Sequence, residues 1–170
     1  FAAICMHPDE VACKELWMKA FGDDEQFADS FIMRHYSRRR MLTAEAEGRM
    51  AAMLHLLPFR TERGRTTYIY GVATDPAFRG RGLASQLMRE AMRLIAERGD
   101  DAALLIPTPG KEWLREFYGR FGFAGDVPAR FVSADRFDFG TGDAAADRAM
   151  VWRRDSSVPL PEQLTASWHS

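Results

Sequence analysis

The feature that most constrains the fold is a strand, a helix and a second strand that follow one another in the middle of the chain. Residues 66–74 are rich in threonine, tyrosine and aliphatic side chains, which predicts a central strand, and Gly71 within it suggests a bulge or a close backbone approach. Residues 82–98 carry apolar side chains at helical spacing before Gly99, and residues 102–106 form a short apolar run. A helix that links two strands in this way predicts a parallel pair with a right-handed crossover.

The segments around this unit predict the rest of the sheet and its helices. Two strands at 41–46 and 50–59 are separated by Glu47, Gly48 and Arg49, which indicates an antiparallel hairpin. The other expected elements are helices at 8–21, 24–36 and 111–120 and strands near 1–6, after Phe123 and at 149–153. The expected fold class is therefore α/β, with a mixed, mostly antiparallel central sheet that has a parallel βαβ core and flanking helices.

Size and charge limit the classes of protein to consider. A chain of 170 residues fits one domain, so we expect a single domain over residues 1–155 and an unassigned, loop-like C-terminal tail over residues 156–170. The formal net charge of −1 argues against a general nucleic-acid binder. No apolar run approaches the roughly 20 residues that cross a bilayer, and no signal peptide is recognisable, so a cytoplasmic protein without a membrane partner is expected.

The cysteines do not predict a disulfide scaffold or a metal site. Cys5 and Cys13 are the only two cysteines in the sequence, which is too few for a disulfide framework. His7 lies between them, but no second pair completes a tetrahedral set of ligands. The sequence therefore predicts no metal.

A turn with two glycines immediately precedes the helix at 82–98. The amino terminus of a helix exposes about four N–H groups without intrahelical partners and carries roughly half a positive charge, so it favours an anion such as a diphosphate. Gly80 and Gly82 would let a phosphate approach these amides closely, and Arg79 and Arg81 add positive charge. The turn is the strongest candidate for a ligand site.

The residues of the turn leave two other interpretations open. Glycine is common in tight turns between a strand and a helix, with no ligand involved. A dinucleotide-binding fold also places glycines here, but the stretch from Gly80 ends in Ser85, where that fingerprint has glycine or alanine. The same fold needs an acid after the next strand, whereas Asp100 and Asp101 precede it.

The stretch 72–84 closely resembles the acyl-CoA-binding motif of the GNAT N-acetyltransferase superfamily. That motif consists of Arg or Gln, two residues, Gly, one residue, and then Gly or Ala. Arg79, Gly82 and Ala84 match it in this sequence. The resemblance implies the GNAT fold and acetyl-CoA as the acyl donor.

A second signature of the family is a tyrosine just ahead of a Gly-Phe turn, and Tyr118, Gly122 and Phe123 resemble it. The two motifs stand in the family's order, and together they are far more specific than either alone. The resemblance extends from about residue 41 to residue 123, is loose before that stretch and poor after it.

The resemblance implies two kinds of contact with the acyl donor. Backbone groups at the end of the strand 66–74 would pair with the pantetheine arm, and amides of the following turn would hold the pyrophosphate. The implied cofactor-binding residues are Val72, Ala73, Thr74, Arg79, Gly80, Arg81, Gly82, Leu83, Ala84 and Ser85.

The resemblance also implies that an amine attacks the thioester directly, with Tyr118 as the general acid for the departing thiolate. A tyrosine hydroxyl has a pKa of about 10 and is therefore a neutral acid at pH 7. By spacing alone, a tyrosine beside Trp113, Phe117 and Phe121 is more often a core residue. No Ser-His-Asp pattern or nucleophile elbow supports an acyl-enzyme route.

The general base and the acceptor are not assigned by the sequence. The candidate bases are Glu45, Glu47, His55 and Asp75, and water can also take the proton. The acceptor is expected to be a small-molecule amine or a peptide amine, and a homodimer is left open. Many family members carry an asparagine where this chain has residues 107–111, which puts the acceptor side in doubt.

The first two helices usually line the acceptor side in this family. The aromatic residues that they and the segment after them offer are Trp17, Phe27, Phe31, His35 and Tyr36, although such residues at helical spacing are more often core. A protein of a different class, a non-catalytic acyl-CoA-binding sensor or scaffold module, would share the glycine turn but would not need the hydroxyl of Tyr118.

Overall fold

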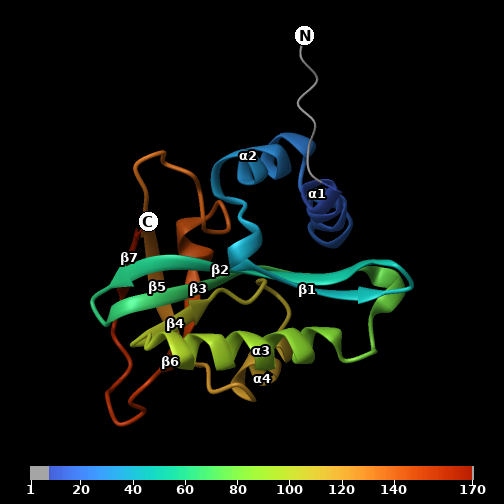
Figure 1. Ribbon diagram of the computed structural model, residues 1–170. Helices are drawn as coiled ribbons and strands as arrows, with labels where there is room; N and C mark the ends of the chain where they lie inside the picture. Colours follow the sequence, from blue (N-terminus) through green and yellow to red (C-terminus); the bar gives the residue numbers. More distant parts are fainter. Residues whose placement is uncertain (1–7, 170) are drawn as a thin grey trace. The chain divides into compact units, whose positions relative to one another are not determined.

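The computed structural model describes residues 8–169. Within them the chain divides into two compact units: an N-terminal unit of residues 8–56 and 71–90, and a C-terminal unit of residues 57–70 and 91–169. Three of the elements labelled in Figure 1 have residues in both units, namely β2 (Arg49–Thr61), β3 (Gly64–Thr74) and α3 (Leu83–Arg98). The strand predicted near residues 1–6, with Cys5 and His7, lies outside the described residues.

The strands form one mixed seven-stranded sheet in the order β1-β2-β3-β4-β6-β5-β7. The strands not yet given bounds are β1 (Met41–Ala46), β4 (Ala102–Leu105), β5 (Ala124–Val132), β6 (Arg148–Arg153) and β7 (Leu164–Trp168). β1 and β2 pair as an antiparallel hairpin, whereas β3 and β4 pair in parallel from Thr66↔Ala102 to Tyr68↔Leu104. The predicted α/β class, the hairpin and the parallel βαβ core are therefore confirmed.

Two helices open the N-terminal unit, α1 (Pro8–Phe21) and α2 (Glu25–His35). The side chain of Asp24 accepts a hydrogen bond from the Phe27 amide at 2.7 Å and so caps α2. Lys14 of α1 forms ion pairs of 2.8 Å with Glu25 and with Asp29. Charged contacts on the surface therefore complement the apolar packing between these two helices.

The packing of the N-terminal unit requires glycine at position 71 of β3. Its φ of 64° lies in the left-handed region. A Cβ at this position would lie 2.7 Å from Cζ3 of Trp17 and 3.0 Å from Cδ2 of His55. The close backbone approach predicted at Gly71 is therefore real, and a helix side chain and a strand side chain fill the space.

α3 ends in the way its sequence predicts. Gly99 adopts a φ of 75°, and the amide of Asp100 donates to the carbonyl of Ile95 at 3.3 Å. This arrangement is the Schellman cap, in which a left-handed glycine lets the chain turn back on the last carbonyls.

The strands of the C-terminal unit close on themselves through β7. We call this closed arrangement of strands the strand ring. β7 pairs in parallel with β5 on one side, from Ala129↔Leu164 to Val132↔Ser167. On its other side, β7 pairs with the end of β2 through Phe59↔Trp168. The residues after 156 were predicted to be loop, and this interpretation is wrong for β7. A five-residue strand flanked by loops has too little periodicity to be recognised from sequence.

Aromatic side chains fill this strand ring. The ring of Phe59 lies 5.2 Å from that of Phe139 and 5.5 Å from that of Trp168, and Tyr68 stacks on Phe131 at 4.7 Å. The hydroxyl of Tyr68 donates to the carbonyl of Phe139 at 2.8 Å, so the buried polar atom is satisfied. Phe139 comes from the 15-residue connection between β5 and β6, which therefore contributes to the core.

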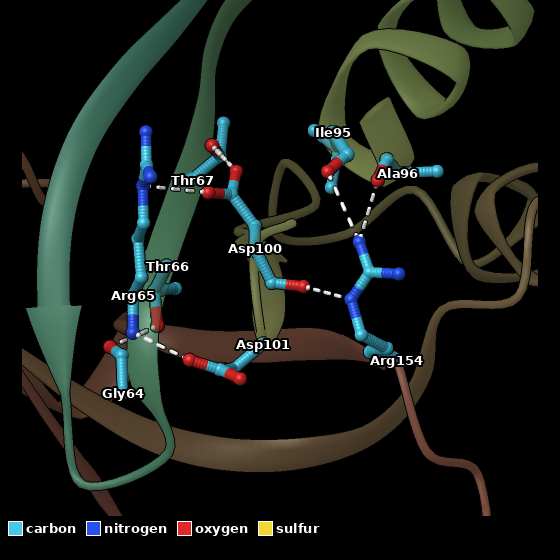
Figure 2. Close-up of polar contacts among 9 residues, drawn as sticks. All are labelled: Gly64, Arg65, Thr66, Thr67, Ile95, Ala96, Asp100, Asp101 and Arg154. Atoms are coloured by element: carbon cyan, nitrogen blue, oxygen red, sulfur yellow. Dashed lines mark hydrogen bonds and ion pairs between the residues drawn. The ribbon is translucent and has the colours of Figure 1, made fainter. Parts of the chain in front are cut away.

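A polar cluster joins the start of β3, the end of α3 and the start of β4 (Figure 2). Asp100 is 2% exposed, and its carboxylate accepts from the hydroxyl of Thr67 at 2.5 Å and pairs with Nε of Arg65 at 3.1 Å. Arg154 donates to the carbonyls of Ala96 at 2.7 Å and of Asp100 at 2.8 Å. The cluster therefore satisfies the last carbonyls of α3 and fixes the crossover into β4.

The remaining helices are short. α4 spans Trp113–Gly119, and three 3₁₀ turns occupy Arg38–Arg40 (η1), Pro76–Phe78 (η2) and Ala144–Ala146 (η3). Trp113 is 64% exposed, so it is not part of the aromatic core around Tyr118 that the sequence suggested. Within residues 8–169, no helix combines the length and the apolar character that a bilayer span requires.

Candidate active site

The segment between β3 and α3 gives the predicted anion site its conformation. Oδ1 of Asp75 accepts a hydrogen bond from the Ala77 amide at 2.9 Å, which starts η2 directly after the strand. Gly80 and Gly82 then adopt φ values of 80° and 75°, in the left-handed region that side chains disfavour. The chain can enter α3 with this sharp geometry because both positions are glycine.

The amides of this turn are available for a ligand. The amide of Gln86 donates to the carbonyl of Gly82 at 3.1 Å, but among the described residues no acceptor is seen for the amides of residues 79–85. A Cβ built on Gly80 or on Gly82 would meet no heavy atom within 4 Å. Open space and unpartnered amides at a helix amino terminus fit the diphosphate of an acyl-CoA.

Asp75 anchors the turn to the rest of the N-terminal unit. Its amide donates to the carbonyl of Ala51 at 2.8 Å, and its Oδ2 lies 3.4 Å from Nζ of Lys19. The hydrogen bond from the Ala77 amide is the main reason that the pKa of Asp75 lies below its ordinary value, and the contact with Lys19 lowers this pKa further. The carboxylate is therefore ionised and committed to the fold, which makes it a poor general base.

Two arginines stack on the buried ring of Phe78 beside the turn. The Cζ atoms of Arg49 and Arg81 lie 5.0 and 4.9 Å from the centre of this ring. Nη1 of Arg81 also lies 4.0 Å from Oε1 of Glu47, in the β1–β2 hairpin. The sequence predicted no ligand-binding role for Arg49 or Phe78, and no local pattern in it links the hairpin to the turn.

The strand residues predicted to bind the pantetheine arm lie at the end of β3. The parallel pairing of β3 with β4 ends at Tyr68↔Leu104, while β3 itself continues to Thr74. The main-chain groups of Val72, Ala73 and Thr74 therefore lie beyond the stretch that pairs with β4. This is the position that a ligand pairing with the strand backbone would need.

Tyr118 lies on α4 in the C-terminal unit. Its side chain is 7% exposed, and burial raises the pKa of its hydroxyl to about 12. Its ring contacts that of Phe117 at 5.2 Å, and the hydroxyl makes no hydrogen bond to a described residue. The hydroxyl proton is therefore not engaged elsewhere in the described part of the chain.

The connection from α4 to β5 holds this tyrosine in place. The amide of Phe123 donates back to the carbonyl of Tyr118 at 3.4 Å. Gly122 has a φ of 92°, and a Cβ on it would lie 3.0 Å from Cδ1 of Trp152. Arg115 of α4 donates to the carbonyl of Gly125 at 2.9 Å. The second sequence signature is therefore a closely packed turn.

The candidate bases differ in their environments. His55 is 1% exposed, and its burial, assisted by Arg40, lowers its pKa to about 3. Its Nε2 faces Sγ of Cys13 at 3.8 Å, so it is a core residue. Glu45 and Glu47 are exposed on the hairpin. The structure thus disfavours His55 and Asp75 as bases and leaves the two glutamates and water.

The aromatic residues considered for the acceptor side form part of the core of the N-terminal unit. Trp17 stacks on Phe31 at 4.8 Å and lies 6.2 Å from Phe27, and its Nε1 donates to Asp23 at 2.9 Å. His35 is buried, whereas Tyr36 is partly buried and its pKa is raised to about 12, mainly by burial. Most of these side chains therefore pack the helices against the strands.

A pocket of about 760 Å³ lies in the C-terminal unit, between β5, β7 and the connection that follows β5. Its lining includes Arg130, Phe131 and Arg136 but none of the residues that the sequence predicted to act on a substrate. The pocket is therefore separate in its residues from the glycine turn and from Tyr118.

Two other ligand classes, a metal ion and a dinucleotide, were considered from the sequence. Among residues 8–169, no three His, Cys, Asp or Glu side chains are grouped so that they could hold a metal ion. A dinucleotide fold would need an exposed acid after the second strand, whereas Asp100 precedes β4 and is bonded to Thr67 and Arg65.

Comparisons with known proteins find the same fold in solved acetyltransferases. The chain is similar over 98% of its length to a GNAT N-acetyltransferase from Escherichia coli, YhbS, crystallised with CoA, with a TM-score of 0.66, 18% identity and 88% of that chain covered. It is similar over 97% of its length to a GNAT acetyltransferase from Brucella melitensis crystallised with acetyl-CoA, with a TM-score of 0.61, 16% identity and 93% coverage.

A third similar structure is the ribosomal-protein-S18-alanine N-acetyltransferase from Escherichia coli, with a TM-score of 0.58 and 14% identity over 93% of this chain and 97% of that one. No curated protein matches the sequence in a direct search. At these identities the solved structures show a shared fold.

The family model described as an acetyltransferase (GNAT) domain matches residues 7–125, a stretch that includes the glycine turn and Tyr118. The chain therefore belongs to the GNAT acetyltransferase family.

Proposed function

We propose that this protein transfers an acetyl group from acetyl-CoA to the amine of an acceptor by direct attack, with Tyr118 as the general acid. The observation that carries the proposal is the turn at 79–85, whose amides have no acceptor among the described residues and whose glycines leave open space. The family of the chain and the crystallisation of two similar proteins with CoA or acetyl-CoA support the same donor.

The donor would be held mainly by the main chain. Amides of Arg79 to Ser85 would bind the diphosphate, because they have no acceptor among the described residues and lie at a helix amino terminus, which favours negative charge. Backbone groups of Val72, Ala73 and Thr74 pair with the amides and carbonyls of the pantetheine arm. When bound, acetyl-CoA supplies an activated acyl group in the form of a thioester.

Tyr118 would act on the leaving group. As the amine nitrogen forms its bond to the acetyl carbon, the carbon–sulfur bond breaks and the sulfur takes the proton of the Tyr118 hydroxyl. A pKa of about 12 keeps this hydroxyl protonated at every pH at which the enzyme is expected to work. Water takes the proton of the attacking nitrogen and returns a proton to the tyrosinate.

The glycine turn provides the direct test of donor binding. Gly82→Leu would place a side chain in front of the amides, and calorimetry should show a loss of CoA affinity of about 100-fold or more, as expected when several hydrogen bonds to a charged group are lost. Gly99→Leu is the matched control, because Gly99 has the same φ of 75° and equally empty surroundings. Equal CoA affinities for the two variants would refute the proposed diphosphate site.

The acceptor can be identified by incubating the protein with acetyl-CoA and a panel of amines, followed by mass spectrometry. The panel includes small amines, lysine peptides and peptides that begin with alanine, because one similar protein is an S18-alanine N-acetyltransferase. We expect at least one member to gain an acetyl group. Tight CoA binding without transfer to any member of a broad panel would favour a non-catalytic acyl-CoA-binding module.

A further inference from the structure

Two exposed arginines, Arg49 and Arg81, lie over the same buried ring, that of Phe78. Phe78 is 1% exposed, so its ring is a fixed platform, whereas Arg49 and Arg81 are both exposed. Each Cζ atom lies within 5.0 Å of the same ring centre, so the two cations are separated by no more than the sum of these distances. The ring attracts each cation, and its burial keeps both stems in place.

Protein anions balance this pair only weakly. Glu47 is the one acid paired with Arg81 among the described residues, and the pair is at the 4.0 Å limit with side chains 69% and 52% exposed. Exposed ion pairs of this kind contribute little and exchange readily for a stronger anion. Arg49 forms no ion pair with a described residue, and the nearby Asp75 already bonds the Ala77 amide and Lys19.

The charge of the donor provides a partner for the two arginines. Coenzyme A carries a phosphomonoester on the 3′ oxygen of its ribose in addition to the diphosphate, and this group is largely a dianion at neutral pH. The amides of residues 79–85 are suited to the diphosphate, which leaves the 3′-phosphate without a partner there. Guanidinium groups bind phosphate oxygens with two parallel hydrogen bonds.

We propose that Arg49 and Arg81, held on the ring of Phe78, form a second phosphate site that binds the 3′-phosphate of coenzyme A. The site makes the protein specific for coenzyme A over 3′-dephospho-coenzyme A. The inference rests on the proposed acyl-CoA function, and it adds a specificity determinant from the β1–β2 hairpin to a turn that would otherwise bind through its main chain.

The experiment compares calorimetric affinities for coenzyme A and for 3′-dephospho-coenzyme A. We expect the unmodified protein to prefer coenzyme A by about 10- to 100-fold, the effect of losing a hydrogen bond between charged groups. Arg49→Gln and Arg81→Gln should each reduce this preference to about threefold or less, and Arg49→Gln should change the affinity for the dephospho form little. Arg49→Lys should retain an intermediate preference, because lysine keeps the charge but loses the planar fork.

Arg89→Gln is the matched control, since Arg89 is an exposed arginine of α3 in the same unit and its loss changes the net charge equally. It should leave the preference unchanged. Equal affinity of the unmodified protein for both ligands, or an undiminished preference in both glutamine variants, would overturn the inference while leaving the diphosphate site intact. Failure of both ligands to bind the unmodified protein would instead overturn the acyl-CoA function and the inference with it.

Discussion

The turn between β3 and α3 and the strand ring of the C-terminal unit use their backbones in opposite ways. In the turn, the amides of residues 79–85 have no acceptor among the described residues, and Gly80 and Gly82 keep side chains out of the space in front of them. In the ring, β7 pairs with β5 and with β2, and aromatic side chains fill the interior.

This difference separates binding from stability. A backbone site depends on main-chain conformation and open space, so substitutions there should change ligand affinity with little loss of folding free energy. A closed ring depends on side-chain volume, so substitutions there should act through packing. Tyr118 is the exception, because it is a buried residue of the C-terminal unit to which we assign a chemical role.

The largest expected effect tests that exception. Tyr118→Phe should lower the turnover number by about 10²–10⁴-fold, because the departing thiolate loses its proton donor. Stability and CoA affinity should change little, because the hydroxyl makes no hydrogen bond to a described residue. Steady-state kinetics, calorimetry and urea unfolding measure the three quantities separately. A variant that turns over as fast as the unmodified protein would discard the acid role.

Removal of one aromatic side chain from the core should destabilise the strand ring. Phe139→Ala should lower the free energy of unfolding by about 3–5 kcal/mol, because a fully buried aromatic side chain is replaced by a cavity. Val132→Ala on β5 is the control, since Val132 is 41% exposed and should cost less than about 0.5 kcal/mol. Urea denaturation gives both values, and similar losses for the two variants would show that the aromatic interior is not the main source of stability.

Acid should weaken the N-terminal unit through His55. Its pKa is lowered to about 3 in the folded protein and is about 6.5 when unfolded, so the unfolded state binds more protons between these values. This contribution to stability is complete above about pH 6.5 and falls by about 2 kcal/mol at pH 5.

A variant without the titrating group isolates this effect from the other histidines. His55→Gln should be less stable at pH 7 because it disturbs the core, but its stability should fall less steeply between pH 7 and pH 5 than that of the unmodified protein. Urea unfolding at several pH values gives the two slopes. Parallel slopes would show that His55 is not buried in its neutral form.

The smallest expected effect concerns the glycines of the N-terminal unit. Gly71→Ala should cost about 1–2 kcal/mol more than Gly48→Ala. Both glycines have left-handed φ values, of 64° and 74°, but only at Gly71 would the new Cβ meet Trp17 and His55. Thermal unfolding of the two variants measures the difference. If they melt at the same temperature, the packing around Gly71 adjusts without cost.

Much of the fold could be predicted because its signals are local. The apolar spacing and Gly99 define α3, the residues 47–49 define the hairpin turn, and the strand–helix–strand order predicts the parallel pairing of β3 with β4. Long amphipathic helices and central strands repeat their pattern over many residues, which is why sequence reasoning identifies them well.

The site was predictable only in part for the same reason. The glycine turn is a contiguous stretch, so both its residues and their conformation follow from the sequence. The stacking of Arg49 on Phe78 joins positions far apart in the chain, and no local pattern contains it. The exposure of Trp113, four residues before Phe117, also depends on what the rest of the chain covers.

The sequence by itself determined the order of the elements from α1 to α4, the family and the turn that would bind a diphosphate, because each depends on neighbouring residues and their backbone preferences. Only the tertiary structure decided that β7 closes the strand ring and that His55 is a buried core residue and therefore a poor general base. It also decided that two arginines lie over the side chain of Phe78. The physical reason is that burial and the pairing of distant segments depend on the whole packed chain, whereas helix and turn propensities depend on a few adjacent residues.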